Sequence, residues 1–131
     1  MILVDTSVWI DLFSKSPSLS IKHEQLVLCV TCGPIIQEIL QGVKQEEKFA
    51  KLKDSMLAVR NIQENIGTDD FLAAADIYRV GRKRGLTIRS SMDCLIASLA
   101  IKHKVPIWHN DRNFDYITKF SPLTTIHSLN P

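Results

Sequence analysis

The chain has 131 residues, of which 45% are hydrophobic and 23% charged, and its net charge at pH 7 is +2. These are ordinary values for a globular protein, and a chain of this length buries roughly two-thirds of its unfolded surface in one core. We therefore expect one domain over residues 1–131. No apolar run approaches the roughly 18 residues that a membrane span needs. The N-terminus lacks the pattern of an export signal, which predicts a cytoplasmic location without a membrane partner.

Positive charge is concentrated in one stretch, since Arg79, Arg82, Lys83, Arg84 and Arg89 fall within eleven residues. Clustered cations are what binding to a polyanion requires. The same residues also suit the exposed C-terminal end of a helix, where positive charge complements the helix dipole. This stretch by itself slightly favours the second interpretation.

The three cysteines are too few for a disulfide scaffold. Cys29 and Cys32 have C-x-x-C spacing, but no second cysteine pair or closely spaced histidine pair accompanies them. A structural zinc site needs about four such ligands, so core packing is the favoured interpretation of these residues. The four histidines also show no ligand spacing along the chain, and only His109 lies close to the acidic residues discussed below.

In chain order, the apolar run Ile2–Val4 predicts a short buried strand that stops at Asp5. Thr6 or Ser7 is placed to cap the helix that follows, in which Trp9 is expected to face the core. A carboxylate at this boundary lies where a buried strand leaves the core.

Pro34 suits the first turn of a helix predicted over residues 34–44. The apolar residues of this segment form one stripe with a period of 3.6 residues. Glu38 lies at the border of the stripe, from which a carboxylate can reach into a cleft. Another helix is predicted over residues 46–59.

Two further helices follow. Thr68 is expected to cap the first, which ends with the basic stretch. Ser90 or Ser91 caps the second, which runs to about residue 103 and is apolar on nearly all sides. Asp93 lies in its first turn, and because burying an unpaired carboxylate is costly, Asp93 needs a partner.

The segments 105–108 and 124–126 predict two last strands, and Asp111 follows the first of them. Strands alternate with helices, which predicts an α/β fold with three α/β/α layers and a central parallel sheet. In such sheets, ligands bind in the crevice at the carboxyl ends of the strands.

Four acidic residues stand at or near the ends of these apolar segments: Asp5, Glu38, Asp93 and Asp111. In one pocket they would repel and raise one another's pKa, whereas a divalent cation reverses the effect. Mg²⁺ and Mn²⁺ prefer oxygen ligands. Such an ion activates water and orients a phosphate, so phosphodiester hydrolysis is the reaction that this set suits best.

Each acid also has a simpler explanation. Asp5 suits a helix cap, Glu38 a solvated surface position, and Asp111 a turn. Asp93 is the hardest to explain in this way, although the first turn of a helix favours an anion. The joint arrangement is stronger than any one member. The chain lacks the glycine-rich phosphate-binding motifs of nucleotide-binding proteins.

Four motifs in order then carry a family resemblance: Asp5-Thr6-Ser7, Pro34-x-x-x-Glu38, Ser91-Met92-Asp93-Cys94 and His109-Asn110-Asp111-x-x-Phe114. They resemble the PIN-domain nucleases, most of all the VapC ribonuclease toxins of bacterial and archaeal toxin–antitoxin pairs. The resemblance covers almost the whole chain. It implies a Mg²⁺-dependent endoribonuclease that hydrolyses RNA phosphodiester bonds with metal-activated water.

The resemblance also implies roles for the acids. Asp5 and Asp93 would be the principal ligands of Mg²⁺, for which Mn²⁺ is the expected substitute. Glu38 would hold metal-bound water or a second ion, and Asp111 would complete the pocket. All four are therefore expected to be catalytic.

Neighbouring residues would support the metal ligands. Thr6 or Ser7 would orient Asp5 or a metal water by hydrogen bonding. Asn113 stands where many relatives carry a further acid, which predicts weaker binding of a second ion. Arg89 and Arg112 are the candidates for contacts with the RNA backbone.

Family members are similar in forming homodimers and in being silenced by a cognate antitoxin, so both partners are expected here. A different class of function is a non-catalytic regulatory module on the same kind of sheet, such as a receiver domain. A receiver needs paired acids after the first strand and a lysine late in the sheet. Asp5 is unpaired, and no lysine directly follows the strand at 105–108.

Overall fold

The computed structural model describes residues 1–130, and its centre is a five-stranded parallel sheet with the strand order β3-β2-β1-β4-β5. The strands are β1 Ile2–Val4, β2 Cys29–Thr31, β3 Arg60–Asn61, β4 Ile107–Trp108 and β5 Thr125–Ile126. The helices are α1 Thr6–Leu12, the 3-10 helix η1 His23–Leu28, α2 Gly33–Gln41, α3 Glu46–Ala58, α4 Thr68–Lys83, α5 Ser91–His103 and α6 Arg112–Thr118.

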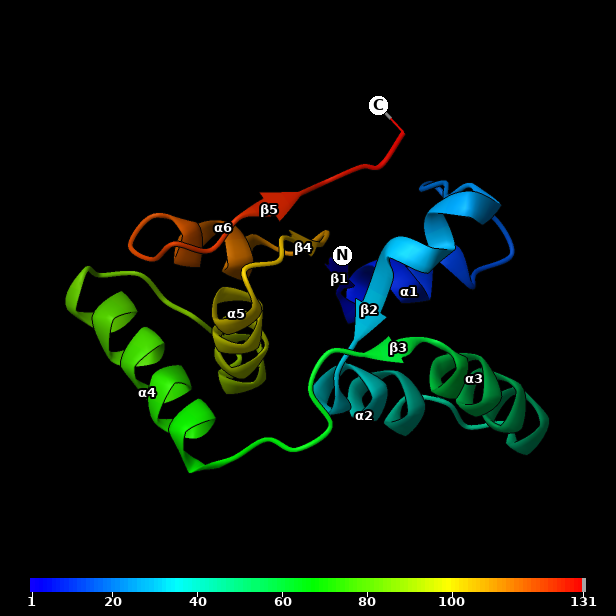
Figure 1. Ribbon diagram of the computed structural model, residues 1–131, viewed down its shortest axis with the longest axis horizontal. Helices are drawn as coiled ribbons and strands as arrows, with labels where there is room; N and C mark the ends of the chain where they lie inside the picture. The colour runs from blue at the N-terminus through cyan, green and yellow to red at the C-terminus, as the bar shows by residue number, and fades with distance from the viewer. Residues whose placement is uncertain (131) are drawn as a thin grey trace.

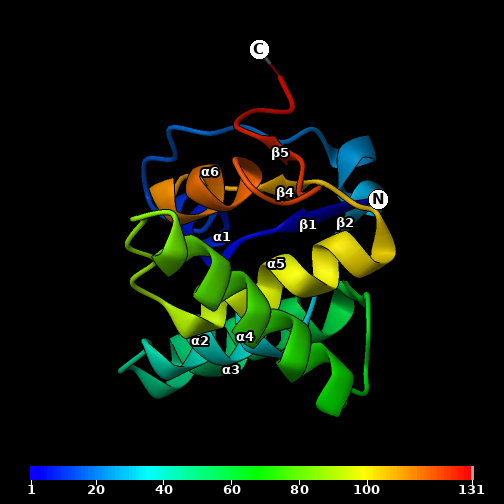
Figure 2. The same ribbon diagram turned by 90° about the vertical axis from the view of Figure 1, so that its left-hand side faces the viewer.

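Helices cover both faces of the sheet, with α1 on one side of β1 and α5 on the other (Figure 1). Figure 2 shows α4 lying alongside α5, on the side of α5 that faces away from the strands. The α/β fold class and the central parallel sheet that the sequence predicts are therefore confirmed.

The central strand β1 pairs with both β2 and β4, and Leu3 stands opposite both Val30 and Ile107. The chain builds outward from β1 to β2 and β3, then returns across the sheet to β4 and β5. The direction in which successive strands are added to the sheet therefore changes between β1 and β4. In open α/β sheets, the carboxyl ends of the strands on either side of such a reversal form the ligand crevice.

The middle of the fold is α5, whose residues 93–100 are all buried. The prediction of a helix buried nearly all round is confirmed because α5 packs between the sheet and α4 (Figures 1 and 2). Trp9 is buried in the core, as its place in the predicted helix indicated, and Trp108 of β4 is buried there as well. Cys29 and Cys32 are free and buried, which agrees with core packing.

Two predicted helix caps are wrong. Asp5 itself caps α1 by accepting a hydrogen bond from the Ser7 N–H, so neither Thr6 nor Ser7 is the cap. In α4 the cap is Gly67, whose N–H donates to the carboxylate of Asp70. An acid at the third helical position can reach back in this way and replace a capping hydroxyl.

The remaining boundaries depart from expectation by a few residues. Helix α2 stops at Gln41 rather than at about residue 44, and strand β4 is limited to Ile107–Trp108. Strand β3 and helix α6 were not predicted, because a two-residue polar strand and a seven-residue helix carry little periodic signal. Among residues 1–130, no helix is both long and apolar enough to cross a membrane.

The core position of α5 can be tested with two matched leucines. Leu99 is fully buried in α5, whereas Leu57 in α3 is 65% exposed. We expect Leu99→Ala to lower the free energy of unfolding by about 2–4 kcal/mol, since it leaves a cavity, and Leu57→Ala to change it by less than about 0.5 kcal/mol. Urea unfolding followed by circular dichroism measures both, and equal effects would contradict this placement of α5.

Candidate metal centre

Three of the four predicted acids come together in the structure. Asp5, Glu38 and Asp93 each offer one carboxylate oxygen, and these oxygens all lie within 4.8 Å of one another. Asp5 follows β1, Glu38 lies on α2, and Asp93 lies in the first turn of α5. Residues far apart in the sequence thus meet at the carboxyl end of the central strand.

Asp5 is held by a network that reaches the neighbouring strand. Its Oδ2 accepts hydrogen bonds from the Ser7 hydroxyl at 2.7 Å and from the Ser7 N–H at 3.2 Å. The Ser7 hydroxyl in turn accepts from the N–H of Asn110, just after β4. Ser7 therefore fixes Asp5 against the loop that follows β4.

Glu38 has its own support. The Thr6 hydroxyl donates to Glu38 Oε1 at 3.3 Å. The sequence predicted that Thr6 or Ser7 would support Asp5 or a metal water. In the structure Ser7 bonds to Asp5, whereas Thr6 bonds to Glu38.

Asp93 finds the partner that its burial requires. The side-chain amide of Asn113 donates to Asp93 Oδ2 at 2.9 Å, and the Asp93 N–H donates to the hydroxyl of Ser90, the cap of α5. A neutral amide satisfies one carboxylate oxygen without adding a charge. Asn113 thus lies in contact with the acidic group.

Asp111 lies beside this group and is not one of the three. Its carboxylate caps α6 by accepting a hydrogen bond from the Asn113 N–H at 2.9 Å. Its charge nevertheless raises the pKa of Asp5, Glu38 and Asp93. Asp111 therefore belongs to the same electrostatic field.

Burial and mutual repulsion shift the titration of the three acids. Burial raises the pKa of Asp93 to about 7, and the charges of Asp5, Asp111 and Glu38 add to the rise, while the hydrogen bond from Asn113 opposes it. Burial is also the largest cause of the raised pKa of Asp5 and of Glu38. These carboxylates favour a proton or another cation as a partner.

The donor set fits a hard divalent cation. Within residues 1–130, no lysine or arginine forms an ion pair with Asp5, Glu38 or Asp93. Three converging carboxylate oxygens without a basic partner are what Mg²⁺ and Mn²⁺ bind. The described residues thus include an acidic group that is able to hold such an ion.

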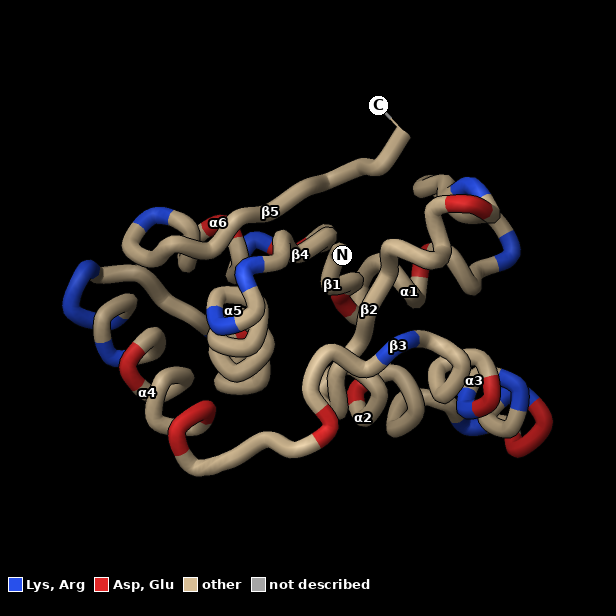
Figure 3. Tube along the Cα trace, in the orientation of Figure 1, with Lys and Arg blue, Asp and Glu red and all other residues tan. Residues whose placement is uncertain are grey.

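A cavity of about 680 Å³ opens next to the acids. Asp111 and Asn113 line it together with Arg89, Arg112 and Tyr116. The two arginines that the sequence singled out therefore line the same cavity as Asp111. Figure 3 shows the further basic residues gathered at the C-terminal end of α4, next to the loop that leads to α5.

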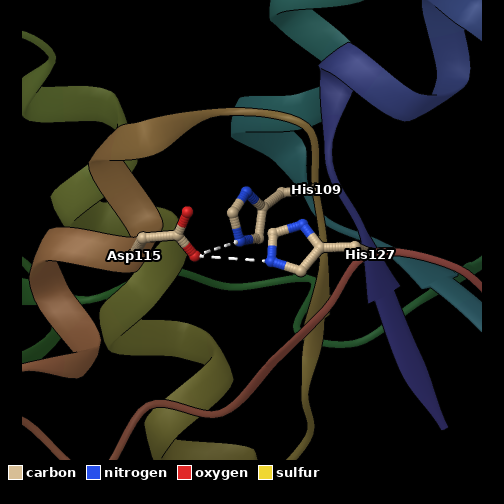
Figure 4. Close-up of side chains that lie close together, drawn as sticks. All are labelled: His109, Asp115 and His127. Carbon is tan, nitrogen blue, oxygen red and sulfur yellow. Dashed lines mark ion pairs between the residues drawn. The ribbon is translucent and has the colours of Figure 1, made fainter.

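The structure also brings together a second group of possible metal ligands, which the sequence did not predict. His109, Asp115 and His127 also bring ligand atoms within 4.8 Å of one another (Figure 4). The two histidines are far apart in the chain, so their spacing gives no signal. Their positions directly after β4 and β5 are the clue that could have paired them.

Comparison with known proteins gives the family. The family model described as "PIN domain" matches residues 2–119. This chain belongs to the PIN-domain family. The PIN domain is 38% identical to Ribonuclease VapC11 of Mycobacterium tuberculosis, in an alignment that covers 94% of this chain and 96% of that protein. It is 29% identical to Ribonuclease VapC1 of Methanocaldococcus jannaschii, over 91% of this chain and 82% of that protein.

Solved structures share the fold of this PIN domain. VapBC2 from Rickettsia felis, bound to a DNA fragment from its promoter, matches with a TM-score of 0.72 and 18% identity, over 96% of this chain and 98% of that one. FitAcB from Neisseria gonorrhoeae matches with a TM-score of 0.69 and 17% identity over the whole of both chains. The predicted family resemblance is thereby confirmed.

The raised pKa of Asp93 predicts the pH dependence of stability without metal. At this carboxyl group the folded protein keeps a proton that the unfolded chain releases near pH 3.8, so the contribution of Asp93 to stability is greatest in acid and is lost as the pH rises through about 7. With EDTA present, we expect Asp93→Asn to stabilise the PIN domain by about 1–2 kcal/mol near pH 8 and by almost nothing near pH 4. Thermal unfolding at both pH values measures this.

The matched control is Asp54→Asn, the same change at an exposed position of α3. It should have little effect at either pH. A destabilising Asp93→Asn near pH 8 would contradict the conclusion that Asp93 is strained when ionised.

Proposed function

We propose that this chain is a Mg²⁺-dependent endoribonuclease and the toxin of a type II toxin–antitoxin pair. The main support for the proposal is that Asp5, Glu38 and Asp93 bring their carboxylates together at the carboxyl end of β1, where the strand order of the sheet reverses. It occurs in a PIN domain that is 38% identical, over almost its whole length, to a protein named as a ribonuclease. The reaction is hydrolysis of RNA phosphodiester bonds by one nuclease domain over residues 1–131, in the cytoplasm.

Each acid has a separate part in the proposed mechanism. Asp5 and Asp93 are the principal metal ligands, Glu38 orients water or a further ion, and Asp111 contributes negative charge at the edge of the cavity. When bound, Mg²⁺, or Mn²⁺ in its place, supplies Lewis acidity that activates water and stabilises charge on the phosphoryl oxygens. Because Asn113 is neutral, one ion is expected to bind more firmly than a second.

The supporting residues hold the acids in place for this role. Ser7 bonds to Asp5 and Thr6 bonds to Glu38, so both carboxylates are oriented before any ion arrives. The Asn113 amide holds Asp93 Oδ2 and leaves the other oxygen of that carboxylate for the ion. Pre-orientation of this kind reduces the cost of organising the ligands.

The substrate would approach through the cavity beside Asp111. RNA is repelled by the acids, and Arg89 and Arg112 on the cavity wall supply opposite charge for its phosphates. The cleavage site would then lie between these two arginines and the three-carboxylate centre. The cluster from Arg79 to Arg84 extends the positive charge along α4.

The proposal includes two protein partners. One solved structure that shares this fold, VapBC-5 from Mycobacterium tuberculosis, is named as a member of the VapBC family of toxin–antitoxin systems, which supports a cognate antitoxin here. The second partner is another copy of this chain, because the family resemblance implies a homodimer.

The carboxylates provide the first test of the proposal. Asp5→Asn, Glu38→Gln and Asp93→Asn each remove a negative charge with little change in shape. We expect each to lower Mn²⁺- or Mg²⁺-dependent cleavage of a fluorescent RNA by roughly 100-fold or more, since a group that binds the catalytic ion is lost. The measurement is the initial cleavage rate at saturating metal.

Asp54→Asn on α3 serves as the control and should cleave at the wild-type rate. If Asp93→Asn kept wild-type cleavage and also arrested growth on expression, the nuclease assignment would fail. Circular dichroism of each variant separates loss of chemistry from loss of fold.

The arginines give a second, separate test. We expect Arg89→Ala and Arg112→Ala to raise the KM for RNA by roughly 3- to 10-fold and to weaken its dependence on salt, because each removes a phosphate contact. Arg60→Ala, at an exposed position on the opposite edge strand β3, is the matched control. If Arg89→Ala and Arg112→Ala both left the KM and its salt dependence unchanged, these two arginines would not be the RNA contacts.

A further inference from the structure

The second group of ligand atoms lies at the edge of the sheet. In the parallel pair β4 and β5, Ile107 stands opposite Thr125 and Trp108 opposite Ile126. The next residues of the two strands are His109 and His127, and their ring centroids are 4.7 Å apart. Figure 4 shows Asp115 of α6 facing both rings from the other side.

The spacing of the three side chains matches a tetrahedral metal site. Asp115 Oδ1 lies 3.3 Å from His109 Nε2 and 3.6 Å from His127 Nε2. Zinc binds nitrogen and oxygen at about 2.0–2.1 Å, so two of its ligand atoms at the tetrahedral angle lie roughly 3.3 Å apart. Both distances therefore place the atoms close to where an ion would hold them.

The buried member of the group is His109, which is 1% exposed. Its Nε2 makes no hydrogen bond, and it faces the carboxylate of Asp115 at the longer distance of 3.3 Å. Buried side-chain nitrogens nearly always have a partner. An ion between His109, Asp115 and His127 would supply one.

We propose that His109, Asp115 and His127 form a second metal site, for Zn²⁺, separate from the three-carboxylate centre. Two imidazole nitrogens and one carboxylate suit zinc, whereas Mg²⁺ prefers oxygen ligands alone. The His127 side chain is 62% exposed and that of Asp115 is 46% exposed, so an ion can enter from solvent. Water then completes the coordination.

Filling this site has a consequence for Asp111. In the structure, His109 Nδ1 accepts a hydrogen bond from the Asp111 N–H at 3.0 Å. The neutral ring therefore carries its proton on Nε2. To bind zinc through Nε2, the ring must move that proton to Nδ1, which then no longer accepts from Asp111. Zinc binding and the backbone contact of Asp111 thus oppose each other.

The test is zinc titration of the untagged protein by calorimetry, with Mg²⁺ in excess to occupy the carboxylate centre. We expect one zinc ion per chain. His127→Asn and Asp115→Asn should each weaken its binding by roughly 10-fold or more, since each removes a ligand. Replacing zinc with Co²⁺ should give the intense visible absorption of a four-coordinate site in the wild type alone.

Two controls make the result specific. His23→Asn removes an exposed histidine of η1 and should leave zinc binding unchanged. Asp5→Asn should also keep the zinc while it loses RNA cleavage, which separates this proposal from the proposed nuclease function. Zinc affinity equal in the wild type and in His127→Asn would overturn the proposal, as would loss of zinc in Asp5→Asn alone.

The link to Asp111 has its own readout. The backbone amide resonance of Asp111 should shift on addition of zinc to the wild type and stay in place in His127→Asn. A wild-type protein that binds zinc with an unmoved Asp111 amide would contradict the tautomer change.

Discussion

The repulsion between Asp5, Glu38 and Asp93 is the constraint on which the rest of the site depends. Two buried carboxylates, Asp5 and Asp93, and the half-buried Glu38 bring oxygens within 4.8 Å of one another without a basic partner among the described residues, and the pKa of each is raised. A protein tolerates such an arrangement only where surrounding structure enforces it. Here the sheet and α5 form that structure, because the strand before Asp5 and the helix that carries Asp93 are buried in one core.

The hydrogen bonds around the acids all come from neutral groups. The hydroxyls of Ser7 and Thr6 and the amide of Asn113 each satisfy one carboxylate oxygen. A lysine or arginine in any of these places would relieve the repulsion, and it would also compete with a metal ion for the same oxygens. Neutral donors orient the ligands and leave their charge available to a cation.

Much of this arrangement could be predicted from the sequence, and the reasons differ by element. The apolar run before Asp5 and the buried pattern of α5 identified the central strand and the central helix, because burial leaves a strong periodic signal. The acids could be grouped because strand ends and helix starts meet at one edge of a parallel sheet. The caps predicted at Thr6 or Ser7 and at Thr68 were wrong, because the carboxylates of Asp5 and Asp70 take the capping role in place of a hydroxyl, and for Asp5 the sequence had left this explanation open.

Other features could not be predicted because they depend on the register between strands. His109 and His127 each follow a predicted strand, but the local sequence does not show that these strands are neighbours, since β5 is two residues long and its pairing with β4 is set by the tertiary fold. The contact between Asn113 and Asp93 likewise follows from where α6 docks on α5. Sequence patterns predict which residues are buried, whereas the contacts of polar side chains depend on how whole elements pack.

The hydroxyl of Ser7 has a wider consequence for how the protein tolerates change. It donates to Asp5 and accepts from the N–H of Asn110 at the same time, so one oxygen atom ties the end of β1 to the end of β4. Alanine can do neither, and the thiol of cysteine is weak in both roles. The Ser7 hydroxyl therefore couples the segment that carries Asp5 to the segment that leads to Asp111, and we expect substitutions tolerated at position 7 to be confined to residues with a hydroxyl group.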